Sequence, residues 1–439
     1  MSVINDLRKL LRHAGFRKLF LVRLVSQAGD GAFQVGLATV LFFSPENAGT
    51  AAQIAGGFAI MFAPFVIAPF VGVMLDRWRR RQVLLWSNIA RGIVTLAAAG
   101  VMYAWGGTWV VAAIGLVALS LNRFILSGLS AGLPVVLNDD DLLLTANSIV
   151  PTLGAGATFV GGGIGFVLGF VLPVGSVRDA SALVFAGVLM TAAALCALRL
   201  GPTQLGPQHI LPGRIRDDVK VVLHDLAIGA KYLTARVTPG QGLLAMAAHR
   251  LLFGIVFIAS ILISRNLLNP GDLQAGMATF AVIVGLIGAG GGIAVVITPI
   301  FSKRTGPQVW VGLMLLLAAA SQFFMAVSYA RWLVMVCALL LGTAAQAGKI
   351  AVDTIVAKDT HDEYRGRAFA FYDLLFNAAF TGAAVLAAFV VPDTGWSFAL
   401  FISLGGAYVL LAFAVLRFFA RTPRPVDATR FDVSPAAQL

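Results

Sequence analysis

Long apolar segments recur along the whole chain and are separated by short polar stretches. A membrane-spanning helix needs about 20 predominantly apolar residues. Segments of this length predict twelve transmembrane helices, at residues 17–43, 51–75, 82–105, 108–136, 143–172, 178–198, 243–268, 272–301, 307–328, 331–356, 367–391 and 395–419. A more hydrophilic stretch divides them into two groups of six. We therefore expect an all-α membrane protein with an N-terminal six-helix bundle (1–198), a cytoplasmic linker (199–241), a C-terminal six-helix bundle (242–420) and a cytoplasmic tail (421–439).

The first predicted span has a polar stripe along one face. Arg23, Gln27, Asp30 and Gln34 are separated by four, three and four residues, which places them on one side of a helix. At about 1.5 Å per residue, Asp30 lies roughly 20 Å from Arg17, close to the middle of the bilayer, and Arg23 only about 9 Å. Ionisable residues at such depth usually face a bundle interior or a water-filled cavity. The stripe therefore predicts one wall of a polar pathway.

Composition and charge also indicate a membrane protein. Of the 439 residues, 59% are hydrophobic and 12% are charged, whereas soluble domains contain roughly 25% charged residues. The net charge of +12 is explained by the Lys and Arg that collect in cytoplasmic loops, so we expect no nucleic-acid partner. With both termini in the cytoplasm, the loops on the other side contain only Arg178, Arg265 and Arg331. The positive-inside rule thus predicts this orientation.

The linker contains a segment, 214–233, whose apolar residues follow helical spacing. Two interpretations stay open for it. It is an amphipathic helix that lies at the inner membrane surface and joins the two halves, or it is a solvated linker helix.

A charged loop follows the second predicted span and contains Gly72, Asp76, Arg77, Arg80 and Arg81. This loop resembles the signature loop of the major facilitator superfamily, from which it departs at Arg79, where the family has a glycine. The resemblance implies a conformational latch between this loop and the start of the eleventh span, near Arg367. Glycine lets membrane helices approach closely, and an aspartate is favoured at a helix N-terminus. A positively charged loop without a switching role is the alternative.

Further segments resemble one branch of this superfamily. The segment SQAGDG in the first span, residues 133–148, and EYRGRAFAFYD at 363–373 are similar to drug exporters that include macrolide efflux proteins and the enterobactin exporter. The resemblance implies the major facilitator fold, two pseudo-symmetric six-helix bundles in the cytoplasmic (inner) membrane. It also implies export of an amphipathic small molecule in exchange for protons by alternating access. The glycine-rich fifth and eighth spans indicate close helix packing.

A proton-coupled exporter needs a carboxylate that binds and releases a proton during its cycle. Asp30 is the best candidate, and the resemblance implies Arg123 as its counter-charge, because the fourth span faces the first in this superfamily. A static ion pair that holds the first half together is the alternative. The candidates for lining a central cavity are the polar residues Arg23, Gln27, Gln34, Asn122, His249, Gln346 and Asn377.

The sequence lacks the signatures of an enzyme. It has no HExxH segment and no Cys/His cluster with metal-ligand spacing, so we expect no catalytic activity, no cofactor and no metal. We expect a monomer whose partners are a small-molecule substrate, protons and the lipid bilayer. Two alternatives to a proton-coupled exporter stay open. One is a transporter of lipids or lipid conjugates, and the other is a membrane sensor or assembly partner without transport activity.

Overall fold

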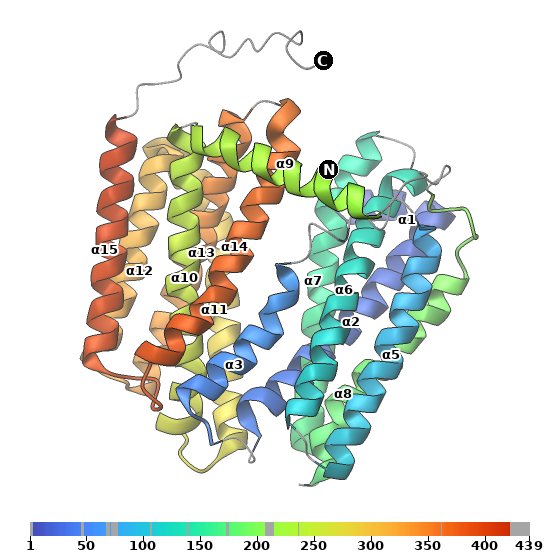
Figure 1. Cartoon of the computed structure of the whole chain (residues 1–439), viewed down its shortest axis with the longest axis horizontal. Helices are drawn as coiled ribbons and strands as arrows, with labels where there is room; N and C mark the ends of the chain where they lie inside the picture. The colour runs from blue at the N-terminus through green and yellow to red at the C-terminus, as the bar shows by residue number, and fades with distance from the viewer. Residues whose placement is uncertain are drawn as a thin grey trace.

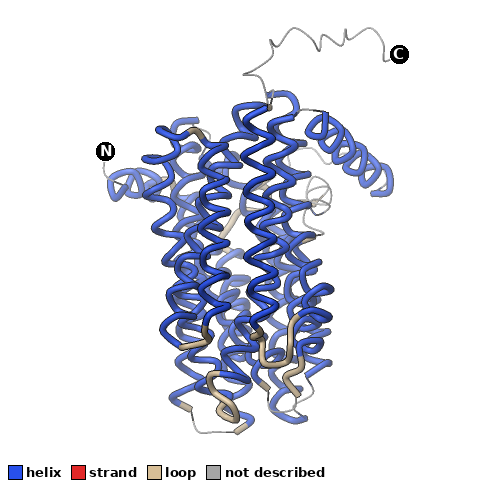
Figure 2. The backbone as a smooth tube through the Cα atoms, turned by 90° about the vertical axis from the view of Figure 1, so that its left-hand side faces the viewer, coloured by secondary structure: helices blue, strands red, loops and turns tan. Residues whose placement is uncertain are grey.

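The structure is a computed structural model of the chain. It describes residues 3–44, 48–66, 71, 78–105, 108–137, 140–172, 175–206, 215–235, 237–360 and 362–421. All regular structure in these ranges is helical, and the long helices run side by side (Figure 2). Within the described ranges, ten helices are long and apolar enough to cross a membrane.

The helices form two bundles, which stand beside each other in Figure 1. The N-terminal bundle consists of α1 (Val3–Arg12), α2 (Ala14–Phe43), α3 (Ala51–Phe62) with the short 3₁₀ turn η1 (Ala63–Phe65), α5 (Arg80–Trp105), α6 (Thr108–Leu137), α7 (Asp140–Val171) and α8 (Ser176–Leu198). The linker helix α9 (Ile215–Ala235) lies at one end of the molecule, against α10 and α14.

The C-terminal bundle repeats this arrangement. It consists of α10 (Val237–Leu262) with the π-helical turn η2 (Ile263–Leu267), α11 (Leu273–Thr305), α12 (Pro307–Val327), α13 (Arg331–Asp359), α14 (Asp362–Val390) and α15 (Phe398–Arg421). In the first bundle α5 packs against α6 and α8, and α2 packs against α7. In the second bundle α12 packs against α13 and α15, and α10 packs against α14. The two bundles are therefore related by an internal pseudo-symmetry.

Small residues set the closest contacts between helices. A Cβ added to Gly31 of α2 would overlap the carbonyl oxygen of Thr158 in α7, and one added to Gly161 of α7 would overlap the carbonyl of Ala28. Membrane helices associate closely where such residues meet. The glycines of the fifth span thus bring α7 into backbone contact with α2, the helix with the polar stripe.

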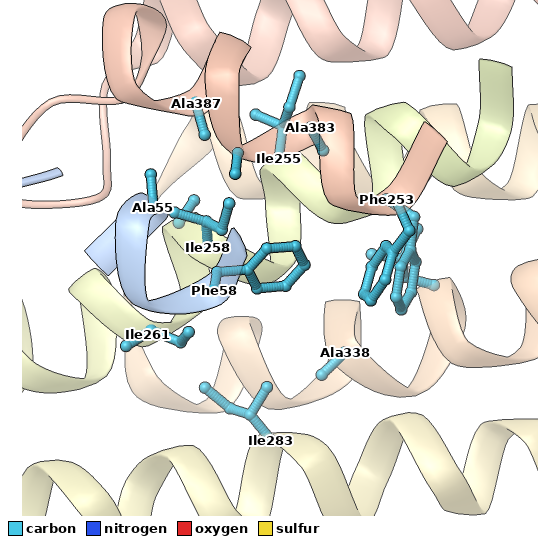
Figure 3. Close-up of a cluster of buried hydrophobic side chains, with 14 of the residues drawn as sticks. Ala55, Phe58, Phe253, Ile255, Ile258, Ile261, Ile283, Ala338, Ala383 and Ala387 are labelled. Atoms are coloured by element: carbon cyan, nitrogen blue, oxygen red, sulfur yellow. The ribbon is translucent and has the colours of Figure 1, made fainter. Parts of the chain in front are cut away.

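Helix α3 connects the two bundles. Its side chains Ala55 and Phe58 lie among residues of α10, α11, α13 and α14, which belong to the other bundle (Figure 3). Phe58 is fully buried there. The second span therefore packs against the C-terminal bundle in its described part, and it forms one side of the interface between the bundles.

Candidate functional site

At the end opposite α9, polar contacts join the two bundles. Arg265 of η2 is only 6% exposed and donates hydrogen bonds to the carbonyls of Phe42 (2.8 Å) and Ser44 (3.2 Å) in the N-terminal bundle. Asn266 donates to the carbonyl of Gly49 (2.8 Å). Gly49 has a φ of +70°, and a Cβ there would meet the guanidinium of Arg265 at 2.9 Å. This glycine therefore permits the close approach of the arginine.

Two more contacts join the bundles at this end. The Asp393 carboxylate accepts a hydrogen bond from the backbone N–H of Ala51 (2.7 Å), at the start of α3. The Arg178 side chain of α8 donates to Gln274 of α11 (3.4 Å). We call this end, with residues 42–44, 48–51, 265–266 and 393, the closed end. Carbonyl and N–H groups that helix ends leave free are used here to hold the bundles together.

At the other end, the α9 end, the ribbons of the two bundles diverge (Figure 1). Polar and apolar side chains contact solvent from this end to the middle of the molecule: Asp373 of α14 is exposed, and Phe159, near the middle of α7, is 68% exposed. An ion pair from Arg367 of α14 to Asp225 of α9 (2.9 Å) attaches the linker helix to the C-terminal bundle. The described hydrogen bonds that join one bundle to the other lie toward the closed end.

Aromatic side chains fill the middle of the interface. Phe62 of α3 lies against Phe65 of η1 (5.7 Å between ring centroids) and against Phe380 of α14 (4.8 Å). Phe58 contacts Phe380 (4.8 Å) and Phe257 of α10 (5.9 Å). Such edge-to-face and tilted pairs contribute about 0.5–1.5 kcal/mol each beyond their buried area. These five rings, together with Phe253 and Phe376, form what we call the aromatic cluster.

An arginine lies at each side of the aromatic cluster. The Arg123 guanidinium of α6 lies over the ring of Phe65, 3.7 Å from its centroid. The Arg250 guanidinium of α10 lies over Phe380 (3.6 Å) and near Phe376 (4.4 Å). The Nε atoms of both arginines are buried without a hydrogen-bond partner. Both cations are therefore held by aromatic faces rather than by carboxylates in the described part of the chain.

A third cation of the interface is neutralised locally. Lys349 of α13 forms an ion pair with Asp353 one helical turn later (2.7 Å). Its ammonium group also lies near the rings of Tyr372 (5.4 Å) and Phe376 (5.7 Å) of α14. Both members of the pair are about one-third exposed. This pair gives the interface a polar edge on the side of the C-terminal bundle.

Asp30 of α2 lies inside the N-terminal bundle, where its side chain meets one from α5. Its carboxylate forms an ion pair with Arg91 of α5, whose side chain is fully buried. Ser26 donates a hydrogen bond to Asn88 (3.1 Å), and Arg91 also reaches the Ser26 hydroxyl (3.5 Å). Asp30 is thus hydrogen-bonded to Arg91 and not to Arg123, and the expected counter-charge is corrected to Arg91. Although α6 does pack against α2, the long side chain of Arg91 extends from α5 to the Asp30 carboxylate and pairs with it first.

Comparison with known proteins identifies the family of the chain. A family model described as Major Facilitator Superfamily matches residues 242–436. The uncharacterized MFS-type transporter Rv0037c of Mycobacterium tuberculosis is 34% identical over 426 residues, which cover 94% of this chain and 92% of the relative. The chain belongs to the major facilitator superfamily. A proposed bacilysin exporter of Bacillus subtilis, BacE, is 26% identical over 324 residues, 72% of this chain and 74% of the relative.

Solved structures of transporters have the same architecture. The nucleoside transporter NupG superposes with a TM-score of 0.67 at 14% sequence identity, over 92% of this chain and 99% of NupG. A POT family transporter in complex with a thioalcohol-conjugated peptide gives 0.66 at 13% identity, over 92% and 95%. At these identities the likeness shows the fold alone. The predicted major facilitator fold of a multi-pass membrane protein is confirmed.

Four polar residues of the predicted stripe on α2 have different surroundings. Arg23 donates to the side chain of Gln27 (2.9 Å), and both pack over Gly154 of α7, whose missing side chain makes room for them. Gln34 is half-buried nearer the closed end, and Asp30 is buried against α5. The stripe is therefore shared between the contact of α2 with α7 and the interior of the bundle.

The remaining predicted lining residues lie in three environments. Asn122 and His249 are buried, and neither the Asn122 Oδ1 nor the two ring nitrogens of His249 find a partner in the described structure. The His249 ring packs 5.6 Å from that of Tyr408 inside the C-terminal bundle. Gln346 is half-buried against Gly291 of α11. Asn377 donates to the backbone of Asp373 (2.8 Å) on α14.

The predicted latch is described only in part. Gly72, Asp76 and Arg77 lie outside the described residues. Arg80 donates to the carbonyls at positions 131 (2.8 Å) and 205 (3.3 Å), and Arg81 to that at 198 (3.4 Å), all within the N-terminal half. Arg367 pairs with the linker helix. In this conformation Arg80 and Arg81 therefore bind backbone groups of the N-terminal half, and Arg367 binds α9. The latch stays a prediction.

Sequence reasoning missed the roles of Arg91, Arg250 and Phe380. Each of these residues lies inside a predicted span, and the two arginines are ionisable residues at membrane depth, which is itself a signal of a structural or functional site. Their partners lie on other helices, however, and the spacing within one span does not show which helices become neighbours. Among the described residues, no cluster of three His, Cys, Asp or Glu side chains could hold a metal ion.

Proposed function

We propose that this protein is a secondary active transporter that exports an amphipathic small molecule in exchange for protons, by alternating access between the two bundles. In this proposal it resides in the cytoplasmic membrane with both termini and the α9 end in the cytoplasm. The conformation described above is then open toward the cytoplasm and closed toward the outside.

The asymmetry between the two ends supports this proposal most directly. The closed end joins the bundles through Arg265, Asn266 and Asp393, which bind backbone groups of the opposite bundle. Such contacts can break and re-form as the bundles rock, because each is a single hydrogen bond worth roughly 0.5–3 kcal/mol. The aromatic cluster lies between the two ends, where a substrate would pass from one side to the other.

The linker helix supports the orientation. Val221 and Leu223 of α9 are exposed, while Leu226 and Leu233 are buried against the protein. Exposed apolar side chains on a helix that also has charged residues are typical of an amphipathic helix that lies at a membrane surface. With α9 at the inner surface, the positive-inside distribution of Lys and Arg is satisfied.

Two groups of carboxylates are candidates for coupling to protons. Asp30 is the acid nearest the middle of α2, but its ion pair with Arg91 favours a structural role. Asp353 and Asp373 lie at the interface, where they contact solvent. The relation to BacE supports export as the direction.

Transport by the purified protein in liposomes tests this proposal. Dansylglycine, dansylglycinamide and dansylethylenediamine are matched amphipathic probes that carry a negative, a neutral and a positive group. We expect at least one of them to accumulate when a pH gradient is imposed, and a protonophore to abolish the accumulation. Equal movement of all three in protein-containing and protein-free liposomes, with or without the gradient, would contradict the proposal. Loss of gradient-driven accumulation with intact counterflow in Asp30→Asn, Asp353→Asn or Asp373→Asn identifies the coupling carboxylate.

A further inference from the structure

We propose that Arg123 and Arg250 bind the anionic group of the substrate, so that the transported molecule is an amphipathic anion such as a carboxylate or a phosphate ester. The identification of the ligand as the transported molecule rests on the proposed function. The binding itself does not, because it follows from the interface.

Arg123 and Arg250 differ from three other cations that lie deep in the helices. Arg91 is paired with Asp30, Lys349 is paired with Asp353, and Arg265 binds two backbone carbonyls. Neither Arg123 nor Arg250 forms a hydrogen bond or ion pair with the described residues. A cation in the membrane interior is costly, and such residues usually mark a substrate or ion pathway.

Each of the two guanidinium groups stacks on an aromatic ring. The face of Arg123 lies on Phe65 and the face of Arg250 lies on Phe380. Stacking uses the face of a guanidinium and leaves its N–H groups directed outward in the plane. Those N–H groups form a fork that matches the two oxygens of a carboxylate or phosphate. Each arginine is therefore fixed in place while its donors stay available to a ligand.

The two arginines belong to one continuous layer of side chains in contact. Arg123 contacts Phe65, Phe65 contacts Phe62, Phe62 contacts Phe380, and Phe380 contacts Arg250. This series crosses from the N-terminal to the C-terminal bundle at the level of the aromatic cluster. The rings between the two arginines offer an apolar surface to the body of a ligand. A molecule with an anionic head and an aromatic or aliphatic body fits this combination.

In the described part of the chain, the charges around the layer do not cancel those of the two arginines. Asp30 is near enough to attract Arg123, but its carboxylate is hydrogen-bonded to Arg91. On the other side, Lys349 and Asp353 neutralise each other, and Asp373 is exposed to solvent. Among the described residues, an anion from solution would therefore find unpaired positive charge on both bundles. A ligand that binds both arginines would also draw the bundles together.

Binding to the full-length protein in detergent tests the inference without requiring transport. The probes are dansylglycine and 1-naphthyl phosphate as anions, dansylglycinamide as the neutral control and dansylethylenediamine as the cationic control. We expect saturable binding of an anion, with the amide and the amine at least tenfold weaker, since a charge-assisted hydrogen bond contributes enough for a factor of about ten or more. Arg123→Gln and Arg250→Gln should each weaken anion binding about tenfold or more and leave binding of the amide unchanged.

Arg417→Gln is the matched control, because Arg417 also lies over a phenylalanine ring but is exposed near the end of α15. Arg123→Lys and Arg250→Lys serve if a glutamine variant does not fold, and they should bind the anion with intermediate affinity because they keep the charge but lose the fork. The inference is overturned if neither anion binds, if anion and amide bind equally, or if the arginine variants match Arg417→Gln. Binding of the anion without any transport would leave this inference standing and contradict the proposed function. Transport of the amine alone would support the proposed function and overturn this inference.

Discussion

Removal of the Asp30 carboxylate should strongly destabilise the N-terminal bundle. In Asp30→Asn, Arg91 keeps its positive charge in a position where its side chain is 0% exposed and its partner was 6% exposed. Breaking one side of a buried ion pair costs about 3–5 kcal/mol, because the remaining charge is left uncompensated. We therefore expect the free energy of unfolding, measured by equilibrium denaturation in mixed micelles, to fall by about that amount.

A double variant of Asp30 and Arg91 shows whether the loss of stability comes from the unpaired charge or from other effects of the substitution. Asp30→Leu with Arg91→Met replaces both charges by apolar side chains of similar size, and this exchange is often neutral or stabilising. We expect the double variant to recover most of the stability that either single change loses. Asp353→Asn is the control, because its pair with Lys349 is about one-third exposed and of the i,i+4 type, which contributes only about 0.3–0.5 kcal/mol. Equal stability losses in Asp30→Asn and Asp353→Asn would refute a structural role for the buried pair.

Three further predictions concern helix packing, the closed end and one buried amide. Gly31→Ala should lose about 1–3 kcal/mol of stability or fail to fold, because its Cβ would overlap a backbone carbonyl of α7, whereas Gly156→Ala has open space and should be nearly neutral in the same denaturation assay. Arg265→Gln removes a guanidinium that donates hydrogen bonds to two backbone carbonyls of the other bundle, so cysteines introduced at the closed end should become more accessible to a water-soluble thiol reagent. Gln322→Met should be neutral or stabilising by about 1 kcal/mol, because the Gln322 Oε1 is buried without a partner beside a cavity of about 30 Å³, and unchanged side-chain volume avoids a new void.

The sequence predicted the fold well because spanning length and charge distribution are local properties. The predicted first span at 17–43 corresponds to α2, and the predicted linker contains α9. Close packing of the fifth span was expected from its glycines, and Gly161 does meet the backbone of α2. These features depend on one segment at a time, so spacing and composition were sufficient.

The candidate site could be predicted only in part. The depth of Asp30 follows from its position in one helix, but its partner Arg91 reaches it from α5 across the interior of the bundle, which no spacing within a span shows. Arg265 was assigned to an outside loop, and its role at the closed end arises from the π-helical turn that places it against the opposite bundle. The contacts of Arg123 and Arg250 likewise depend on which phenylalanines other helices bring to them.

Distances measured at both ends of the molecule test alternating access most directly. Pulsed electron paramagnetic resonance in lipid nanodiscs is suited to this, with both native cysteines replaced and spin labels at Asn147 and Lys303 for the α9 end, or at Ser176 and Pro270 for the closed end. The account predicts two distance populations at each end, which shift in opposite directions when dansylglycine is added or the pH is changed. A single distance at each end that no probe, pH or Arg265→Gln substitution alters would contradict it.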